Sequence, residues 1–199
     1  VLSMPGVVQH TQESLRKEVR TLAGLGIPGV ILFGIPARKD GFGSGADDRD
    51  GVVQVALRSL RDEVGDSLVL MADTCLDEYT DHGHCGVLND RNEVDNDRTL
   101  ELYARIARAQ AEAGAHLVAP SGMMDGQVGV IRAALDGDGR SDVAIMAYAA
   151  KFASPLYGPF REAAEGAPRF GDRTGYQEDP TNGAEAMREI RAVLEQGAD

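Results

Sequence analysis

The order of apolar runs along the chain constrains its fold more than any other feature. Four short runs rich in Val, Ile, Leu and Ala alternate with stretches in which apolar residues recur at helical spacing. Such runs are typical of strands buried on both faces, and their alternation with helices is typical of a parallel sheet covered by helices. The expected strands are 29–34, 68–72, 116–120 and 143–148, and the expected helices are 13–25, 52–64, 99–113, 127–135 and 185–194.

Two α/β architectures fit this alternation, an open doubly wound sheet and a (β/α)₈ barrel. The open sheet usually carries a GxGxxG phosphate loop after its first strand. The glycine-rich segment 41–45 follows the first expected strand here, but it lacks that spacing, and acidic residues precede the next helix. We therefore expect this loop to lie over the mouth of a barrel rather than to bind a phosphate, and both architectures remain open at this point.

Composition excludes several classes of partner. The chain has 20 Lys and Arg against 32 Asp and Glu, a formal net charge of −12, which is a poor match for nucleic acid or an anionic membrane. No apolar run approaches the roughly 20 residues of a membrane span. Two cysteines do not make a disulfide framework. We expect a soluble, cytoplasmic protein that binds neither nucleic acid nor membrane.

A group of metal-ligand residues follows the second expected strand. If that strand continues, its period of two places Asp73, Cys75 and Asp77 on one face, and Cys85 folds back across a glycine-flanked turn. Two thiolates and a carboxylate with a fourth position open suit a catalytic zinc, and the carboxylate leaves magnesium as an alternative. The other interpretation is two buried cysteines without a metal.

A lysine closes the fourth expected strand. Burial at the end of an apolar strand would lower the pKa of Lys151 and make its neutral amine a nucleophile toward carbonyl groups. Arg161 and Arg173 follow, and their planar guanidinium groups suit a substrate carboxylate, to which Gln177 could add a hydrogen bond. The alternative is that Lys151 extends into solvent.

Two further groups of residues follow toward the C-terminus, an aromatic segment and a set of acidic residues. The aromatic segment 155–160, together with 171–173, suits a lid that excludes water from a site, and the alternative is a loop packed for stability. Glu178, Asp179 and Glu189 are expected to form a solvated acidic face.

The segment Lys151-Phe-Ala-Ser-Pro-Leu-Tyr-Gly-Pro-Phe-Arg161 closely resembles the Schiff-base lysine segment of the porphobilinogen synthase (5-aminolaevulinate dehydratase) family. The resemblance covers nearly the whole chain. It implies a (β/α)₈ TIM barrel of which residues 1–199, with four of the eight strands, are about the middle half, as a single catalytic domain truncated at both ends. It implies a (β/α)₈ hydro-lyase that condenses two molecules of 5-aminolaevulinate to porphobilinogen with loss of two waters, in tetrapyrrole (haem) biosynthesis, as a homo-octamer or other homo-oligomer. Further matching segments, in the family's order, are 4–6, 30–34, 73–75, 82–85, 119–121, 123–126, 171–173 and 176–177.

The resemblance also implies roles for single residues. Lys151 resembles the lysine that holds the second substrate as an imine. Arg161, Arg173 and Gln177 are similar to the groups that bind the carboxylate of this substrate. Asp73 resembles the neighbouring active-site acid.

The metal ligands are where the chain departs from the family pattern. Cys75, Asp77 and Cys85 lie where zinc-dependent members have three cysteines, so Asp77 leaves Zn²⁺ and Mg²⁺ as alternatives. Glu189 resembles a ligand of the allosteric Mg²⁺ of some members. Gly122 stands where many members have Asp, which weakens the case for a regulatory metal.

One expected catalytic group is absent from the 199 residues. The family has a second essential lysine on the strand after the Gly-Ala-Asp segment, at which this chain ends. We therefore expect the 199-residue polypeptide alone to aggregate or remain partly unfolded and to be inactive, and the function to belong to the parent protein. The alternatives are a non-catalytic metal-binding barrel remnant and a lysine-imine aldolase of the same fold, which usually has no metal.

Overall fold

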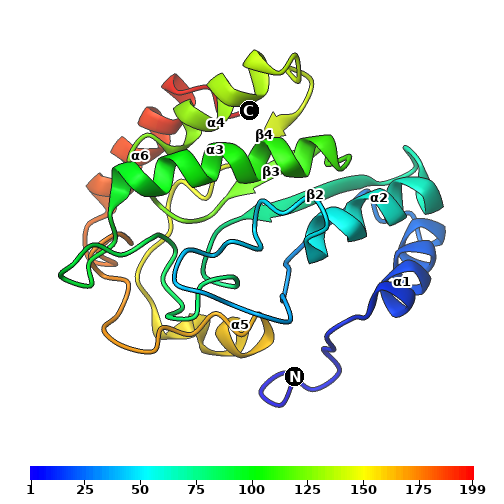
Figure 1. The fold of residues 1–199 in the computed structure, drawn as a ribbon, viewed down its shortest axis with the longest axis horizontal. Coiled ribbons are helices and arrows are strands. Elements are labelled where there is room, and N and C mark those ends of the chain that lie inside the picture. The colour runs from blue at the N-terminus through cyan, green and yellow to red at the C-terminus, as the bar shows by residue number, and fades with distance from the viewer.

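Four parallel strands form one sheet in chain order in the computed structural model, which describes residues 1–199 (Figure 1). The strands are β1 (Gly29–Leu32), β2 (Val69–Thr74), β3 (Leu117–Pro120) and β4 (Ala144–Ile145). Each strand pairs with its neighbour in sequence, and the order never reverses. A doubly wound sheet needs a reversal of strand order, whereas a barrel adds its strands in sequence. The sheet therefore has the topology of part of a (β/α)₈ barrel.

Helices connect the strands and cover one side of the sheet (Figure 1). Helix α2 occupies 52–64, as the sequence predicts, because Val53, Leu57 and Leu60 recur on one face and are buried. None of the helices is both long enough and apolar enough to cross a membrane. Their bounds are α1 (Gln12–Gly24), α2 (Val52–Val64), α3 (Asn96–Glu112), α4 (Gln127–Gly137), α5 (Gly158–Ala163) and α6 (Gly183–Glu195).

Two large apolar clusters hold the helices on the sheet. The first joins α1 and α2 to β1 and β2 around Leu57 and Leu70. The second joins α3 and α4 to β3 and β4 around Ile131 and Ile145. A third, small cluster seats Leu76 of the loop after β2 on Ile106 of α3. This loop is therefore anchored by its own apolar residues rather than free in solvent.

The edge strands differ from the sequence prediction. Strand β1, expected to be buried on both faces, is buried only at Leu32, and Phe33 beyond it is 36% exposed. The reason is that β1 has a strand neighbour on one side only. Strand β4, expected over 143–148, comprises only Ala144–Ile145. Lys151 therefore lies in the loop after β4 rather than at its end.

Two further elements differ from the sequence prediction. The first helix, expected over 13–25, ends at Gly24, and Leu25 beyond it is 73% exposed. The segment 155–160 is not an irregular loop, because Pro155–Tyr157 form a 3₁₀ turn that leads directly into α5. The edge of the Phe160 ring packs against Phe33, with ring centroids 5.1 Å apart.

The loops that follow the strands meet at one end of the sheet, on the left in Figure 1. Backbone bridges tie them together, Asp40 to Thr80 and Phe152 to Glu178. Arg169 also donates its backbone N–H to the carbonyl of His82, at 3.0 Å. Functional residues of parallel sheets lie at the carboxyl ends of the strands and in the loops that follow, so a functional site is expected at this end.

Candidate active site

The loop after β2 forms a buried cluster of metal-ligand atoms. One ligand atom from each of Cys75, Asp77 and Cys85 lies within 4.8 Å of the others, and all three residues are buried. The sequence argument for this cluster was partly wrong, because β2 ends at Thr74 and strand alternation does not continue to Asp77. A tight turn replaces it, in which Thr80 donates its backbone N–H to the carbonyl of Leu76, at 2.8 Å.

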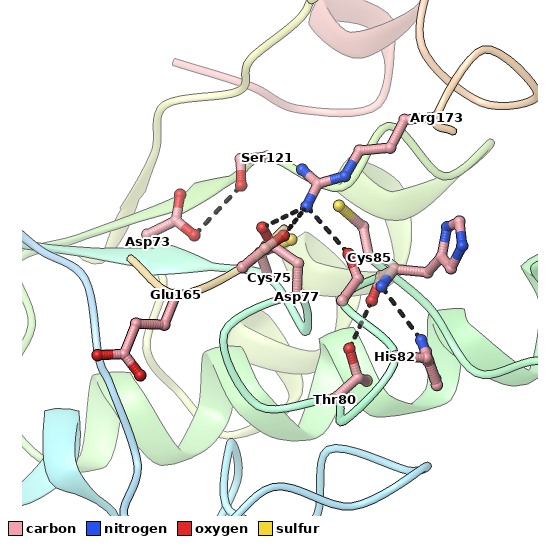
Figure 2. Close-up of polar contacts among 12 residues, drawn as sticks. Asp73, Cys75, Asp77, Thr80, His82, Cys85, Ser121, Glu165 and Arg173 are labelled. Atoms are coloured by element: carbon pink, nitrogen blue, oxygen red, sulfur yellow. Dashed lines mark hydrogen bonds and ion pairs between the residues drawn. The ribbon is translucent and has the colours of Figure 1, made fainter. Parts of the chain in front are cut away.

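A second turn returns Cys85 to the cluster (Figure 2). Gly83 has a φ of +73°, and a Cβ at this position would clash with the carbonyl of Ala167. A side chain is therefore excluded there by conformation and by space. The turn is closed by Thr80, whose hydroxyl donates to the carbonyl of His84 at 2.9 Å, and by His82, whose Nδ1 accepts from the N–H of His84 at 3.1 Å.

A buried tyrosine lies beneath the two cysteines. The hydroxyl of Tyr103 donates to the carbonyl of Cys85 at 2.8 Å and lies 3.5 Å from the sulfur of Cys75. A Cβ on Gly122 would clash with this hydroxyl. The bare backbone at Gly122 therefore leaves room for Tyr103. Sequence reasoning missed this residue, because a tyrosine on the apolar face of an alanine-rich helix looks like ordinary core.

The structure places Arg173 on Asp77 (Figure 2). Its Nη2 donates to Asp77 Oδ2 at 2.8 Å, to the carbonyl of Gly83 at 3.0 Å and to the carbonyl of Gly166 at 2.5 Å. The two charged side chains are only 3% and 4% exposed. Burial is the largest single influence and raises the pKa of Asp77, but Arg173, together with Cys75, Lys151 and Glu78, lowers it by more, so the net pKa is lowered. The pair is therefore a buried ion pair.

Lys151 is buried and does not extend into solvent. Its Nζ donates to the carbonyl of Ser121 at 2.6 Å, and the residue is 9% exposed. The ammonium lies 5.5 Å from the ring centre of Tyr148 and 5.8 Å from that of Tyr157. Two aromatic faces and one carbonyl thus fix the amine at the strand ends.

The expectation that burial lowers the pKa of Lys151 is wrong for the net effect. Burial does act in that direction, but nearby acidic groups act more strongly, and the pKa lies above that of a free lysine. The reason is the number of acidic side chains that the fold gathers around one amine. These groups are Cys85, Cys75, Asp77 and Asp73.

Asp73 lies at the end of β2 and, like Lys151, is hydrogen-bonded to Ser121. Ser121 donates its hydroxyl to Asp73 Oδ2 at 3.2 Å, while Oδ1 is buried without a partner. Burial and the charge of Asp77 raise the pKa of Asp73 to about 7, against the opposing effects of Lys151 and Ser121. A carboxyl group that titrates near neutrality can both donate and accept a proton, as general acid–base catalysis requires.

The remaining expected carboxylate-binding residues have unpaired polar atoms. Arg161 lies 5.8 Å from the ring centre of Tyr157, on which Lys151 also lies, and its Nε is buried without a partner. Gln177 is buried with both amide atoms unpartnered. Buried polar atoms normally have hydrogen-bond partners, so the unpartnered atoms of Arg161 and Gln177 indicate groups that bind a ligand or water.

An acidic cavity of about 630 Å³ lies beside this site, lined by Gln177, Glu178, Glu185 and Glu189 among others. The expectation of a solvated face is wrong for Glu178, which is 4% exposed with neither carboxyl oxygen hydrogen-bonded. The cause is backbone pairing, because Glu178 bonds on both sides of Phe152, to Lys151 and Ala153. Asp179 is exposed as expected.

Burial, aided by Glu185 and Glu189, raises the pKa of Glu178. The folded protein therefore holds this proton at pH values where the unfolded chain has lost it, so stability falls as pH rises above the ordinary glutamate value of about 4.3. We expect Glu178→Gln to raise the Tm of the full-length protein at pH 8 and to leave it nearly unchanged at pH 4, with a chelator present. Glu195→Gln, at an exposed position of α6, is the control. An equal shift at both pH values would contradict the prediction.

Comparisons with a family model, with curated proteins and with solved structures all identify the same enzyme family. The family model for delta-aminolevulinic acid dehydratase matches residues 1–199. The enzymes of that name from Streptomyces coelicolor and Mycobacterium tuberculosis are 57% and 58% identical over the whole chain, which spans 61% of their length. A crystal structure of delta-aminolevulinic acid dehydratase (porphobilinogen synthase) from Toxoplasma gondii, in complex with the product porphobilinogen, is 38% identical. It superposes with a TM-score of 0.96 over 99% of this chain and 57% of its own.

Proposed function

Because this chain belongs to the delta-aminolevulinic acid dehydratase family, we propose that the full-length protein condenses two molecules of 5-aminolaevulinate to porphobilinogen with loss of two waters. Residues 1–199 then form the partial (β/α)₈ catalytic domain. The observation that carries the proposal is the buried amine of Lys151, held beside the carboxyl group of Asp73 and the cysteine cluster. A cytoplasmic homo-oligomer, as an octamer or another assembly, belongs to the same proposal and rests on the family resemblance alone.

Lys151 is the proposed nucleophile. The acidic groups around Lys151 hold its amine protonated, so it first gives a proton to the carboxylate of Asp73. The neutral amine then adds to the keto carbon of the substrate, and the carbonyl oxygen leaves as water while a C=N bond forms. Asp73 is the proposed acid and base, because its pKa of about 7 lets it give a proton to the leaving oxygen and take one back. Ser121 contacts both residues, through its carbonyl and its hydroxyl, and keeps them on one side of the site.

The substrate carboxylate is proposed to lie against Arg161, Arg173 and Gln177. The support is the buried, unpartnered Nε of Arg161 and the two unpartnered amide atoms of Gln177. A guanidinium group recognises a carboxylate by charge and by its planar geometry. Tyr157, which contacts both Arg161 and Lys151, sets the separation between carboxylate and keto carbon.

Cys75, Asp77 and Cys85 are the proposed ligands of the active-site metal. Their donor atoms fit a divalent cation, because two sulfurs and one carboxylate oxygen are buried within 4.8 Å of one another. Sulfur ligands favour Zn²⁺, and the carboxylate leaves Mg²⁺ as the alternative. When bound, the cation supplies positive charge that polarises a substrate oxygen. Glu189 is proposed for an allosteric Mg²⁺, supported by the unpartnered buried carboxylate of Glu178 in the same cavity.

Borohydride trapping tests the function. We expect incubation of the full-length protein with 5-aminolaevulinate and borohydride to leave a reduced adduct on Lys151, located by peptide mass spectrometry, and porphobilinogen to form when borohydride is omitted. Exposed Lys17 and half-buried Lys39, whose amine donates to the carbonyl of Glu165, are internal controls and should stay unmodified. An adduct without porphobilinogen would favour an aldolase. The absence of any adduct on Lys151 would favour a metal-binding remnant.

A further inference from the structure

One hydrogen bond joins Arg173 to Asp77, two residues with different proposed roles. Asp77 is a candidate metal ligand and Arg173 a candidate for the substrate carboxylate, yet the two side chains hold each other. The Arg173 Nη2 to Asp77 Oδ2 distance is 2.8 Å, and the residues lie 96 positions apart in the chain. Figure 2 shows the guanidinium group directly beside the two cysteines. A carboxylate that is already neutralised by one cation attracts a second cation less strongly.

The position of the guanidinium group is fixed by more than Asp77. The same nitrogen donates to the carbonyls of Gly83 and Gly166, which belong to the loop of Cys85 and to the segment after α5. A Cβ on Gly166 would lie 2.6 Å from Asp77 Oδ2, so this backbone packs directly against the carboxylate. Asp77 is therefore enclosed between Arg173 and the backbone, with the two sulfurs nearby.

We propose that Arg173 competes with the active-site metal for Asp77 and thereby sets the metal affinity of the Cys75–Asp77–Cys85 cluster. In the metal-free protein the guanidinium group supplies the positive charge that this buried carboxylate requires. A divalent cation that takes the carboxylate oxygen breaks the ion pair and frees Arg173 for the carboxylate of the substrate. The inference rests on the proposed metal site but not on the imine chemistry of Lys151.

Zinc affinity tests the competition. Full-length protein is titrated with Zn²⁺ against a chromogenic chelator at fixed pH, as wild type, Arg173→Gln, Asp77→Asn and the double variant. We expect Arg173→Gln to tighten zinc binding about tenfold, which corresponds to about 1.4 kcal/mol. In the Asp77→Asn background the same substitution should change the affinity less than about twofold, because the competition requires the carboxylate. Arg108→Gln, which removes a surface arginine paired with Asp138, is the control and should have no effect.

Thermal melting supplies a second measurement. Arg173→Gln leaves the buried carboxylate of Asp77 unpaired, so the metal-free variant should melt below wild type and gain more from added Zn²⁺ than wild type does. If Arg173→Gln does not fold, Arg173→Lys carries the test. A lysine keeps the charge without the planar fork, and it should tighten zinc binding about threefold, again only when Asp77 is present.

Three results would overturn the proposal. One is an unchanged zinc affinity in Arg173→Gln, and another is an equal gain with Asp77 and with its asparagine variant, which would indicate charge acting at a distance. The third is the absence of zinc binding in every variant. That last result would remove the metal site as well, while an adduct on Lys151 would still support the synthase.

Discussion

Replacement of Lys151 by methionine in the full-length protein is expected to lower kcat for porphobilinogen formation about a thousandfold or more. The amine is the only group in the cluster that can form an imine, and removal of a covalent nucleophile has effects of this size. Methionine has a similar length and an apolar stem, so it should fill the space between Tyr148 and Tyr157 without unfolding the loop. The measurement is initial rate against substrate concentration.

A second variant separates charge from chemistry. Lys151→Arg keeps a cation that can reach the carbonyl of Ser121, but it forms no imine, so it should be as inactive as the methionine variant. Lys39→Met is the matched control, because Lys39 also donates to a backbone carbonyl, that of Glu165. Activity of the arginine variant within about tenfold of wild type would show that Lys151 acts by charge alone.

Gly122→Ala is expected to destabilise the protein by about 2–4 kcal/mol, since overpacking a closed core forces backbone and side-chain shifts. The added methyl group meets the hydroxyl of Tyr103 and lies 2.5 Å from its ring carbon Cζ. Tyr103 is fully buried and bonded to Cys85, so it cannot move without loss of that contact. Urea unfolding followed by circular dichroism measures the change in the free energy of unfolding.

A glycine with open space around it provides the control. Gly24 ends α1, and a Cβ there would meet nothing within 4 Å. Gly24→Ala is therefore expected to be neutral or to stabilise the protein by up to about 1 kcal/mol, through the higher helix propensity of alanine. If Gly122→Ala unfolds at the same urea concentration as Gly24→Ala, the Tyr103 contact is not a close-packed one. Tyr103→Phe should not rescue Gly122→Ala, because the ring carbon remains.

Most of the fold was predictable from local sequence. The strand–helix alternation identified all four strands, and the periodicity of 52–64 gave α2 with its bounds. The errors fall at the edges, where β1 is half-buried and β4 is short. Burial at an edge depends on which strand lies beside it, and an apolar run carries no information about its neighbours.

The candidate site also has features that the sequence predicted and features that it did not. Lys151, Cys75 and Asp77 could be chosen as candidates from residue types near the ends of the expected strands, because a (β/α)₈ fold brings such ends together. The sequence by itself determined which residues were candidates. Only the tertiary structure decided that Arg173 lies on Asp77 and that acidic groups raise the pKa of Lys151. The physical reason is that charge interactions depend on distances of a few ångströms between segments far apart in the chain, and only packing sets those distances.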